Sequence, residues 1–125
     1  RVIDESWFTG LDVRGKAVII HTGWARHWKT DQYFEGHPYL TEGAAQVLKA
    51  GGATLVGIDT YNIDDTADGR RPVHTVLLGA DILIVEHMCN VEAIPVDRPF
   101  RFYAVPVKVK SFGTFPVRAF VAVEN

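Results

Sequence analysis

The sequence has few of the features that mark secreted, membrane-spanning or nucleic-acid-binding proteins. Its 125 residues include one cysteine, Cys89, which excludes an intrachain disulfide framework and fits a reducing, cytoplasmic location. No apolar run approaches the roughly 20 residues that a membrane helix needs, and no signal-peptide pattern opens the chain. The net charge is only −2 and the basic residues are scattered, so we expect neither nucleic acid nor a membrane as a partner.

Several well-known active-site motifs are also missing. There is no phosphate-binding glycine motif and no GxSxG sequence. The segment Asp64–Thr75 resembles a calcium loop only superficially, because its twelfth position is threonine and a strand precedes it. The histidines His21, His27 and His37 do not have the spacing of a zinc motif. No histidine-based triad surrounds Cys89 in the sequence, which favours a buried, inert thiol.

What the chain does have is the composition of one globular domain. Hydrophobic residues make up 47% of it, and a chain of this length buries about two-thirds of its unfolded surface. We therefore expect residues 1–125 to form a single domain. The start, Arg1–Glu5, lacks a methionine and reads like mid-protein sequence, so we expect a processed terminus, a chosen starting point or a fragment of a longer protein.

The order of predicted elements indicates an α/β fold. A helix should be capped by Thr41 and end at Gly51 and Gly52, and a short helix, Thr75–Leu78, should be closed by Gly79. Alternation of strands and helices implies parallel strands joined by crossover helices. The predicted parallel strands are Lys16–His21, Thr54–Asp59 and Ile82–His87.

The C-terminal part has a different pattern. Arg101–Lys110 and Pro116–Val123 alternate between apolar and polar residues, with a turn at Ser111–Thr114 between them. We predict an antiparallel hairpin that closes the sheet.

Polar residues follow each of the three predicted parallel strands. Ligands of open α/β sheets bind outside the carboxyl ends of the strands, so we expect a site at this edge. The residues concerned are His21 and Thr22, Asp59 and Thr60, and Glu86 and His87.

The segment Arg71–Asn90 is the most informative. It places His74 at the start of a short helix and Glu86 at the end of the apolar run Ile82–Val85, which is typical of a strand covered on both faces. The reversal at Gly79 should bring the two side chains together. They are either half a metal site or an acid/base pair; alternatively, backbone donors satisfy Glu86 and His74 merely lies near a helix N-terminus.

Aromatic residues are concentrated in the loop Trp24–Pro38. Trp24 and Trp28 are our candidate substrate-binding residues, and with Tyr33 and Phe34 they would form the wall of an aromatic pocket. The alternative is that these rings close the loop over the core or form an oligomer interface.

Five blocks, taken together, resemble the cyclase family of metal-dependent hydrolases, which includes bacterial kynurenine formamidase and isatin hydrolase. The resemblance runs from about Val13 to Phe120 and corresponds to the C-terminal part of a full family member. The blocks are HTGWARHW, YFEGHPYLTEGAA, GIDTYNIDD, RPVHTVLLGADILIVEHMCNVEAIP and FGTFPVRAF.

The resemblance implies a swivelling β/β/α fold, a dimer or higher homo-oligomer, and a site for zinc or manganese. It also implies that His74 and Glu86 are metal-ligating and catalytic residues. The family's upstream HxGTHxDxPxH motif supplies the other ligands, and no H-x3-H-x-D occurs in these residues. Two protein ligands are fewer than the three usual at catalytic zinc, which predicts weak or no metal binding and little activity by this chain alone.

Three interpretations follow. The chain is part of a hydrolase of amides or lactams, of arylformamidase type; or a non-catalytic oligomeric domain that binds a small molecule; or a truncated coding segment that still folds.

Overall fold

The computed structural model describes residues 1–124. The chain forms two compact units, Arg1–Val91 and Glu92–Asn125, which are described separately.

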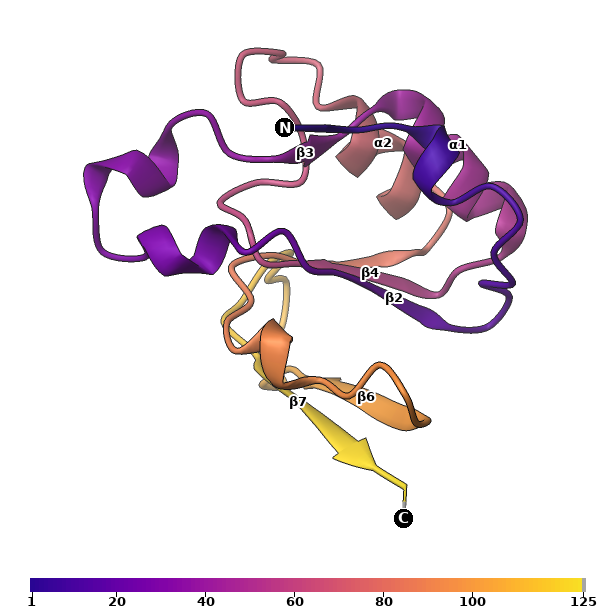
Figure 1. Ribbon diagram of the computed structural model, residues 1–125. Helices are drawn as coiled ribbons and strands as arrows, with labels where there is room; N and C mark the ends of the chain where they lie inside the picture. Colours follow the sequence, from indigo (N-terminus) through magenta and orange to yellow (C-terminus); the bar gives the residue numbers. More distant parts are fainter. Residues whose placement is uncertain (125) are drawn as a thin grey trace. The chain divides into compact units, whose positions relative to one another are not determined.

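The first unit contains a three-stranded parallel sheet. The strands are β2 (Ala17–Ile20), β4 (Leu55–Ile58) and β5 (Leu83–Val85), and they lie in the order β2-β4-β5. The helices α1 (Glu42–Gly51) and α2 (Pro72–Leu78) lie on the same side of this sheet (Figure 1). The predicted arrangement of parallel strands with crossover helices is therefore confirmed.

Helix α1 begins and ends where its capping residues predict. The hydroxyl of Thr41 accepts a hydrogen bond from the backbone N–H of Ala44 at 3.1 Å. At the other end Gly52 has a φ of 79°, and its N–H donates to the carbonyl of Leu48. A left-handed residue at this point closes the helix with little strain only when it is glycine.

The core lies between the two helices and the central strand. All four residues of β4 are buried, as expected for a strand with neighbours on both sides. Val56 and Ile58 belong to one apolar cluster with Leu48 of α1 and with Val73 and Leu77 of α2. Each such fully buried side chain contributes about 1.5–3 kcal/mol to stability.

The third strand, β5, is not buried on both faces, so that prediction is wrong. Leu83 is 61% exposed, whereas Ile82 is buried and Ile84 packs against the core cluster. Successive side chains of a strand point to opposite faces, and both helices lie on one face of this sheet. The apolar run is therefore an edge strand with one core-facing side.

The N-terminal part also contains short elements that the sequence analysis did not locate. Strand β1 (Val2–Ile3) pairs in parallel with β3 (Tyr39–Leu40) in a separate two-stranded sheet. The long aromatic loop includes two short 3-10 helices. The 3-10 helices of the chain are η1 (Glu5–Trp7), η2 (Trp24–His27), η3 (Asp31–Phe34) and η4 (Val91–Ala93).

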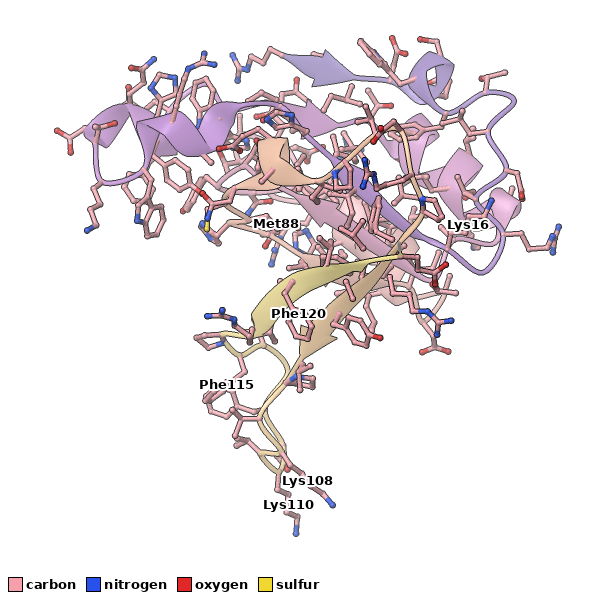
Figure 2. All side chains as sticks on the ribbon, turned by 60° about the horizontal axis from the view of Figure 1, so that its bottom comes forward. Lys16, Met88, Lys108, Lys110, Phe115 and Phe120 are labelled. Atoms are coloured by element: carbon pink, nitrogen blue, oxygen red, sulfur yellow. The ribbon has the colours of Figure 1, made fainter. Side chains whose placement is uncertain are left out.

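The second unit contains the predicted antiparallel hairpin. Strand β6 (Phe100–Val105) pairs with β7 (Arg118–Val123), and the rings of Tyr103 and Phe120 stack across the pair with centroids 4.9 Å apart. Figure 2 shows Phe120 on this pair and Lys108 in the long connection between its strands. We had expected this hairpin to close the parallel sheet. Within residues 1–124, however, β6 and β7 pair only with each other and form a separate two-stranded sheet.

None of the helices in residues 1–124 has the length and apolar character that crossing a membrane would require.

Candidate functional site

The carboxyl ends of β2 and β4 are held together by one buried carboxylate. Asp59 follows β4 directly and is only 1% exposed. It accepts hydrogen bonds from the backbone N–H groups of Thr22 and Gly23, both at 2.8 Å, and from the Thr22 hydroxyl at 2.6 Å. Asp59 therefore fixes the start of the loop after β2, which is the ordinary capping role of an aspartate after a buried strand.

The ends of β4 and β5 are joined by backbone hydrogen bonds. The N–H of His87 donates to the carbonyl of Thr60 at 3.0 Å, and that of Met88 donates to Ile58 at 3.2 Å. These bonds bring the residues that follow β5 beside those that follow β4. The predicted convergence of polar residues at one sheet edge is present in the structure.

Glu86 follows β5 and has a side chain that is 21% exposed. Its carboxylate accepts a hydrogen bond from the backbone N–H of Ile63 at 2.7 Å. A backbone donor thus satisfies part of this half-buried carboxylate, as the alternative interpretation of the residue required.

His74 lies in the first turn of α2, close to Glu86. Its Nε2 atom is 3.6 Å from Oε1 of Glu86, and its side chain is 14% exposed. The helix begins at Pro72, three residues before the predicted start, so His74 lies inside the helix. The predicted juxtaposition of His74 and Glu86 is present in the structure.

The other nitrogen of His74 is bound by Asp64, which the sequence analysis did not identify. Nδ1 of His74 lies 2.6 Å from Oδ2 of Asp64. The same carboxylate accepts from the backbone N–H groups of Val73 at 2.6 Å and His74 at 3.1 Å. Asp64 could have been identified from the missing N-terminal cap of α2. Arg71 and Pro72 supply no side-chain acceptor for the first N–H groups of the helix, so an acceptor must come from elsewhere in the chain.

Arg71 is a further neighbour of the imidazole. It has a φ of 50°, and its Nη2 atom is 2.8 Å from Nε2 of His74. A guanidinium only donates hydrogen bonds, so this contact is a hydrogen bond only when the ring is neutral and Nε2 is unprotonated. The proton of the neutral ring is then on Nδ1, facing Asp64.

Charge and burial shift the pKa values of both members of the pair. The Glu86 carboxylate raises the pKa of His74 above its ordinary 6.5; burial opposes this rise and Asp64 adds to it. Burial raises the pKa of Glu86, but His74 and the N–H of Ile63 together outweigh it, so the pKa lies below the ordinary 4.5. The protonated imidazole and the carboxylate therefore stabilise one another.

The aromatic loop contacts the residue next to Glu86. The hydroxyl of Tyr33, a buried residue, is 3.0 Å from Nδ1 of His87, and burial together with the nearby Asp59 and Glu86 raises the pKa of Tyr33 to about 12. The Trp28 ring is 55% exposed and packs edge-on against Tyr33 and His87, with centroids 5.0 and 6.1 Å apart.

The two tryptophans predicted to bind substrate lie in different surroundings. Trp24 uses its indole N–H to donate to the carbonyl of Tyr33 at 3.0 Å, which ties the loop to itself. Trp28 keeps an exposed ring beside His87. Of the two, Trp28 is better placed to contact a ligand at the sheet edge.

The remaining histidines do not join this pair. His37 is buried with its Nδ1 near the Pro38 carbonyl, His27 contacts Arg26, and His21 is exposed, 4.0 Å from Asp59. Within residues 1–124 no group of three or more His, Cys, Asp or Glu side chains is arranged to hold a metal ion. Asp64 does not complete such a group, because it contacts the opposite nitrogen of the imidazole.

Cys89 is exposed, so the expectation of a buried thiol is wrong. The preceding residue, Met88, is buried, and its sulfur packs closely against Gly57 of β4. A Cβ atom at position 57 would lie only 2.6 Å from this sulfur. Packing of Met88 against the sheet leaves the next side chain directed to solvent.

Comparison with known proteins agrees with the predicted resemblance. Residues 5–65, which include Asp59 and Asp64 but neither His74 nor Glu86, match the family described as "Putative cyclase". The chain is 32% identical over 120 residues to kynurenine formamidase of Bordetella avium, covering 94% of this chain and 54% of that protein. It spans about half the length of the curated relatives it matches.

Solved structures agree with the fold. An isatin hydrolase bound to the product analogue thioisatinate superimposes with a TM-score of 0.82 at 18% identity, over 98% of this chain and 53% of that one. A potential metal-dependent hydrolase with cyclase activity gives a TM-score of 0.63 at 25% identity, over 98% and 57% of the two chains. The resemblance to the cyclase family and the mixed α/β fold are both confirmed.

Proposed function

We propose that this chain, which resembles the cyclase family over nearly its whole length, carries part of the active site of a metal-dependent amide hydrolase. The observation that supports it best is the approach of His74 Nε2 to Glu86 Oε1 at 3.6 Å, at the carboxyl edge of the parallel sheet. The substrate class we propose is an N-formyl arylamine, as for a formamidase, or a cyclic amide. The relatives described above motivate both.

The donor atoms fit zinc or manganese as a partial set. An imidazole nitrogen and a carboxylate oxygen are ligands that both ions accept, and the two side chains are largely shielded from solvent. When bound, such an ion would polarise a substrate carbonyl and lower the pKa of water. Two protein ligands are fewer than a catalytic zinc usually has, so we propose that additional ligands come from outside this pair.

The residues of this chain hold the two donors in place. The N–H of Ile63 fixes the Glu86 carboxylate, and the Asp64 carboxylate fixes the ring of His74. Without an ion, the same pair would exchange a proton between an imidazole and a carboxylate, so an acid/base role remains the alternative for these residues. Trp28 would contact the aromatic part of the substrate, and Trp24 would hold the loop.

A titration of the 125-residue chain with Zn²⁺ and with Mn²⁺ by calorimetry tests the metal site. We expect weak binding that is lost in His74→Ala and Glu86→Gln, because each variant removes one donor. His21→Ala is the matched control, since His21 is an exposed histidine at the same sheet edge. Equal binding by all four chains would contradict the proposed site.

A formamidase assay with N-formylkynurenine tests the second part of the proposal. We expect the 125 residues alone to hydrolyse little or none of it, with or without metal. Robust metal-dependent turnover that His74→Ala abolishes would show that these residues hold a complete active site, contrary to the incomplete one proposed here.

A non-catalytic, oligomeric domain that binds a small molecule is the second candidate function. The observation that favours it is the exposed Trp28, which packs edge-on against Tyr33 and His87 at the sheet edge and could contact an aromatic ligand without a metal. Metal-independent binding of an aromatic amide that Trp28→Ala abolishes and His74→Ala leaves unchanged would support this function over the first.

A further inference from the structure

We infer that Asp64 is a positioning residue that fixes the tautomer and the orientation of the His74 imidazole. In the neutral ring it keeps the proton on Nδ1 and so leaves Nε2, the ring nitrogen on the side of Glu86, unprotonated. The consequence for metal binding rests on the function proposed above, whereas the tautomer itself does not.

The Asp64 carboxylate is held in place by backbone N–H groups of helix α2. Oδ1 accepts from the N–H of Val73 at 2.6 Å, and Oδ2 accepts from the N–H of His74 at 3.1 Å. The side chain is 2% exposed. A carboxylate bound by two backbone donors in a buried place has little freedom to rotate, so its second contact on Oδ2 has a fixed direction.

That second contact determines where the ring proton lies. Oδ2 of Asp64 is 2.6 Å from Nδ1 of His74, and an ionised carboxylate only accepts hydrogen bonds. Nδ1 must therefore carry a proton, and in the neutral ring Nε2 has none. The contact of Arg71 Nη2 with Nε2 at 2.8 Å agrees independently, because a guanidinium has only donors to offer.

Asp64 also caps the N-terminus of α2, and this role is linked to its contact with the His74 ring. Helix α2 starts at Pro72 after a left-handed Arg71, with no side-chain cap from its own N-terminal residue. Asp64, from the preceding loop, accepts the N–H groups that such a cap would satisfy. One carboxylate thus sets both where the helix begins and how His74 is turned within its first turn.

The direct test measures the tautomer of His74 in the metal-free 125-residue chain. Long-range ¹H–¹⁵N correlation spectra at alkaline pH, with the ring neutral, distinguish a protonated Nδ1 from a protonated Nε2. The spectrum of His74→Gln assigns the signals. We expect the Nδ1–H form to predominate for His74 in the unaltered chain; predominance of the Nε2–H form there, or an even mixture, would overturn the inference.

The Asp64→Asn variant tests the cause. An amide NH₂ facing Nδ1 donates to it, so we expect the His74 ring to shift towards the Nε2–H tautomer. Asp59→Asn is the matched control, because Asp59 is equally buried and accepts two backbone N–H groups at the same sheet edge. We expect no tautomer change there, and a His74 spectrum unaltered by Asp64→Asn would overturn the inference.

Metal titration separates this inference from the proposed function. If the function holds, Asp64→Asn should weaken Zn²⁺ binding by about 10- to 100-fold, as loss of such supporting partners typically does, and Asp59→Asn should weaken it less. A tautomer shift in chains that bind no metal would uphold the positioning role of Asp64 and contradict the metal site instead.

Discussion

Three acidic side chains at the edge of the parallel sheet are removed from water to different degrees, and each is satisfied by backbone N–H groups. Asp59 holds the loop after β2, Asp64 holds the start of α2, and Glu86 holds the loop at Ile63. Burial of a carboxylate costs free energy unless such donors or a cation meet it. Asp64 contacts Nδ1 of His74, whereas Glu86 lies near Nε2 and is the most exposed of the three carboxylates, which is why Glu86 and His74 are our candidates for chemistry.

The His74–Glu86 pair should add most to the stability of the chain in mildly acidic solution. The pKa of His74 is raised on folding, so its contribution is complete below the ordinary 6.5 and is lost as pH rises through the raised value. The pKa of Glu86 is lowered on folding, so its contribution is complete above the ordinary 4.5 and is lost as pH falls through the lowered value. Both contributions are present between about 4.5 and 6.5.

Urea unfolding across this pH range, in the unaltered chain and in Glu86→Gln, measures the effect. We expect the difference in free energy of unfolding to be largest between those two values and to shrink on either side. A difference that does not change with pH would mean that the pair adds no ionic stabilisation.

The sequence predicted the His74–Glu86 contact but not Asp64, and the reason is physical. A strand that ends in Glu86 and a short reversal through Gly79 limit where His74 can lie, so nearby residues determine that contact. The bond from Asp64 joins a loop to a helix that lacks its own cap, and its geometry depends on the left-handed Arg71. The sequence analysis considered Asp64 only as the first position of a calcium-like loop, not as a partner of His74.

At the scale of the elements, helix α1 was predictable because both of its ends are encoded in a few adjacent residues. The hydroxyl of Thr41 and the left-handed Gly52 each act within one turn. The pairing of β1 with β3 was not predictable, because each strand has two residues and they are far apart in the sequence. The burial of β5 was misjudged because an apolar run does not reveal which of its faces the helices cover.

We expect Thr41→Ala to lower the free energy of unfolding by about 1 kcal/mol, because it removes the acceptor for the N–H of Ala44. Urea denaturation measures this value. Thr66→Ala, at an exposed threonine in the loop before α2, is the control and should change the value by less than about 0.5 kcal/mol. Equal effects of the two substitutions would show that the cap adds nothing to the stability of α1.

At the scale of the whole molecule, exposed aromatic side chains support the expectation of a homo-oligomer. Trp28 and Phe34 are more than half exposed in the loop after β2, and Phe112 is similarly exposed in the connection between β6 and β7. Exposed aromatic residues are typical of the central part of protein interfaces. A two-fold dimer is the commonest arrangement by which one chain covers such a surface, and it should bury more than about 1,000 Å² in total.

Light scattering at low micromolar concentration should therefore give the mass of a dimer or a larger homo-oligomer. Phe34→Ser and Phe112→Ser test the loop and the hairpin connection separately, and the variant that lowers the mass identifies the surface used. Lys108→Ser, an exposed residue of the same connection, is the control and should leave the mass unchanged. A monomer of unaltered sequence with an intact circular dichroism spectrum would contradict the prediction, because the exposed aromatic side chains would then be stable in water without a second copy.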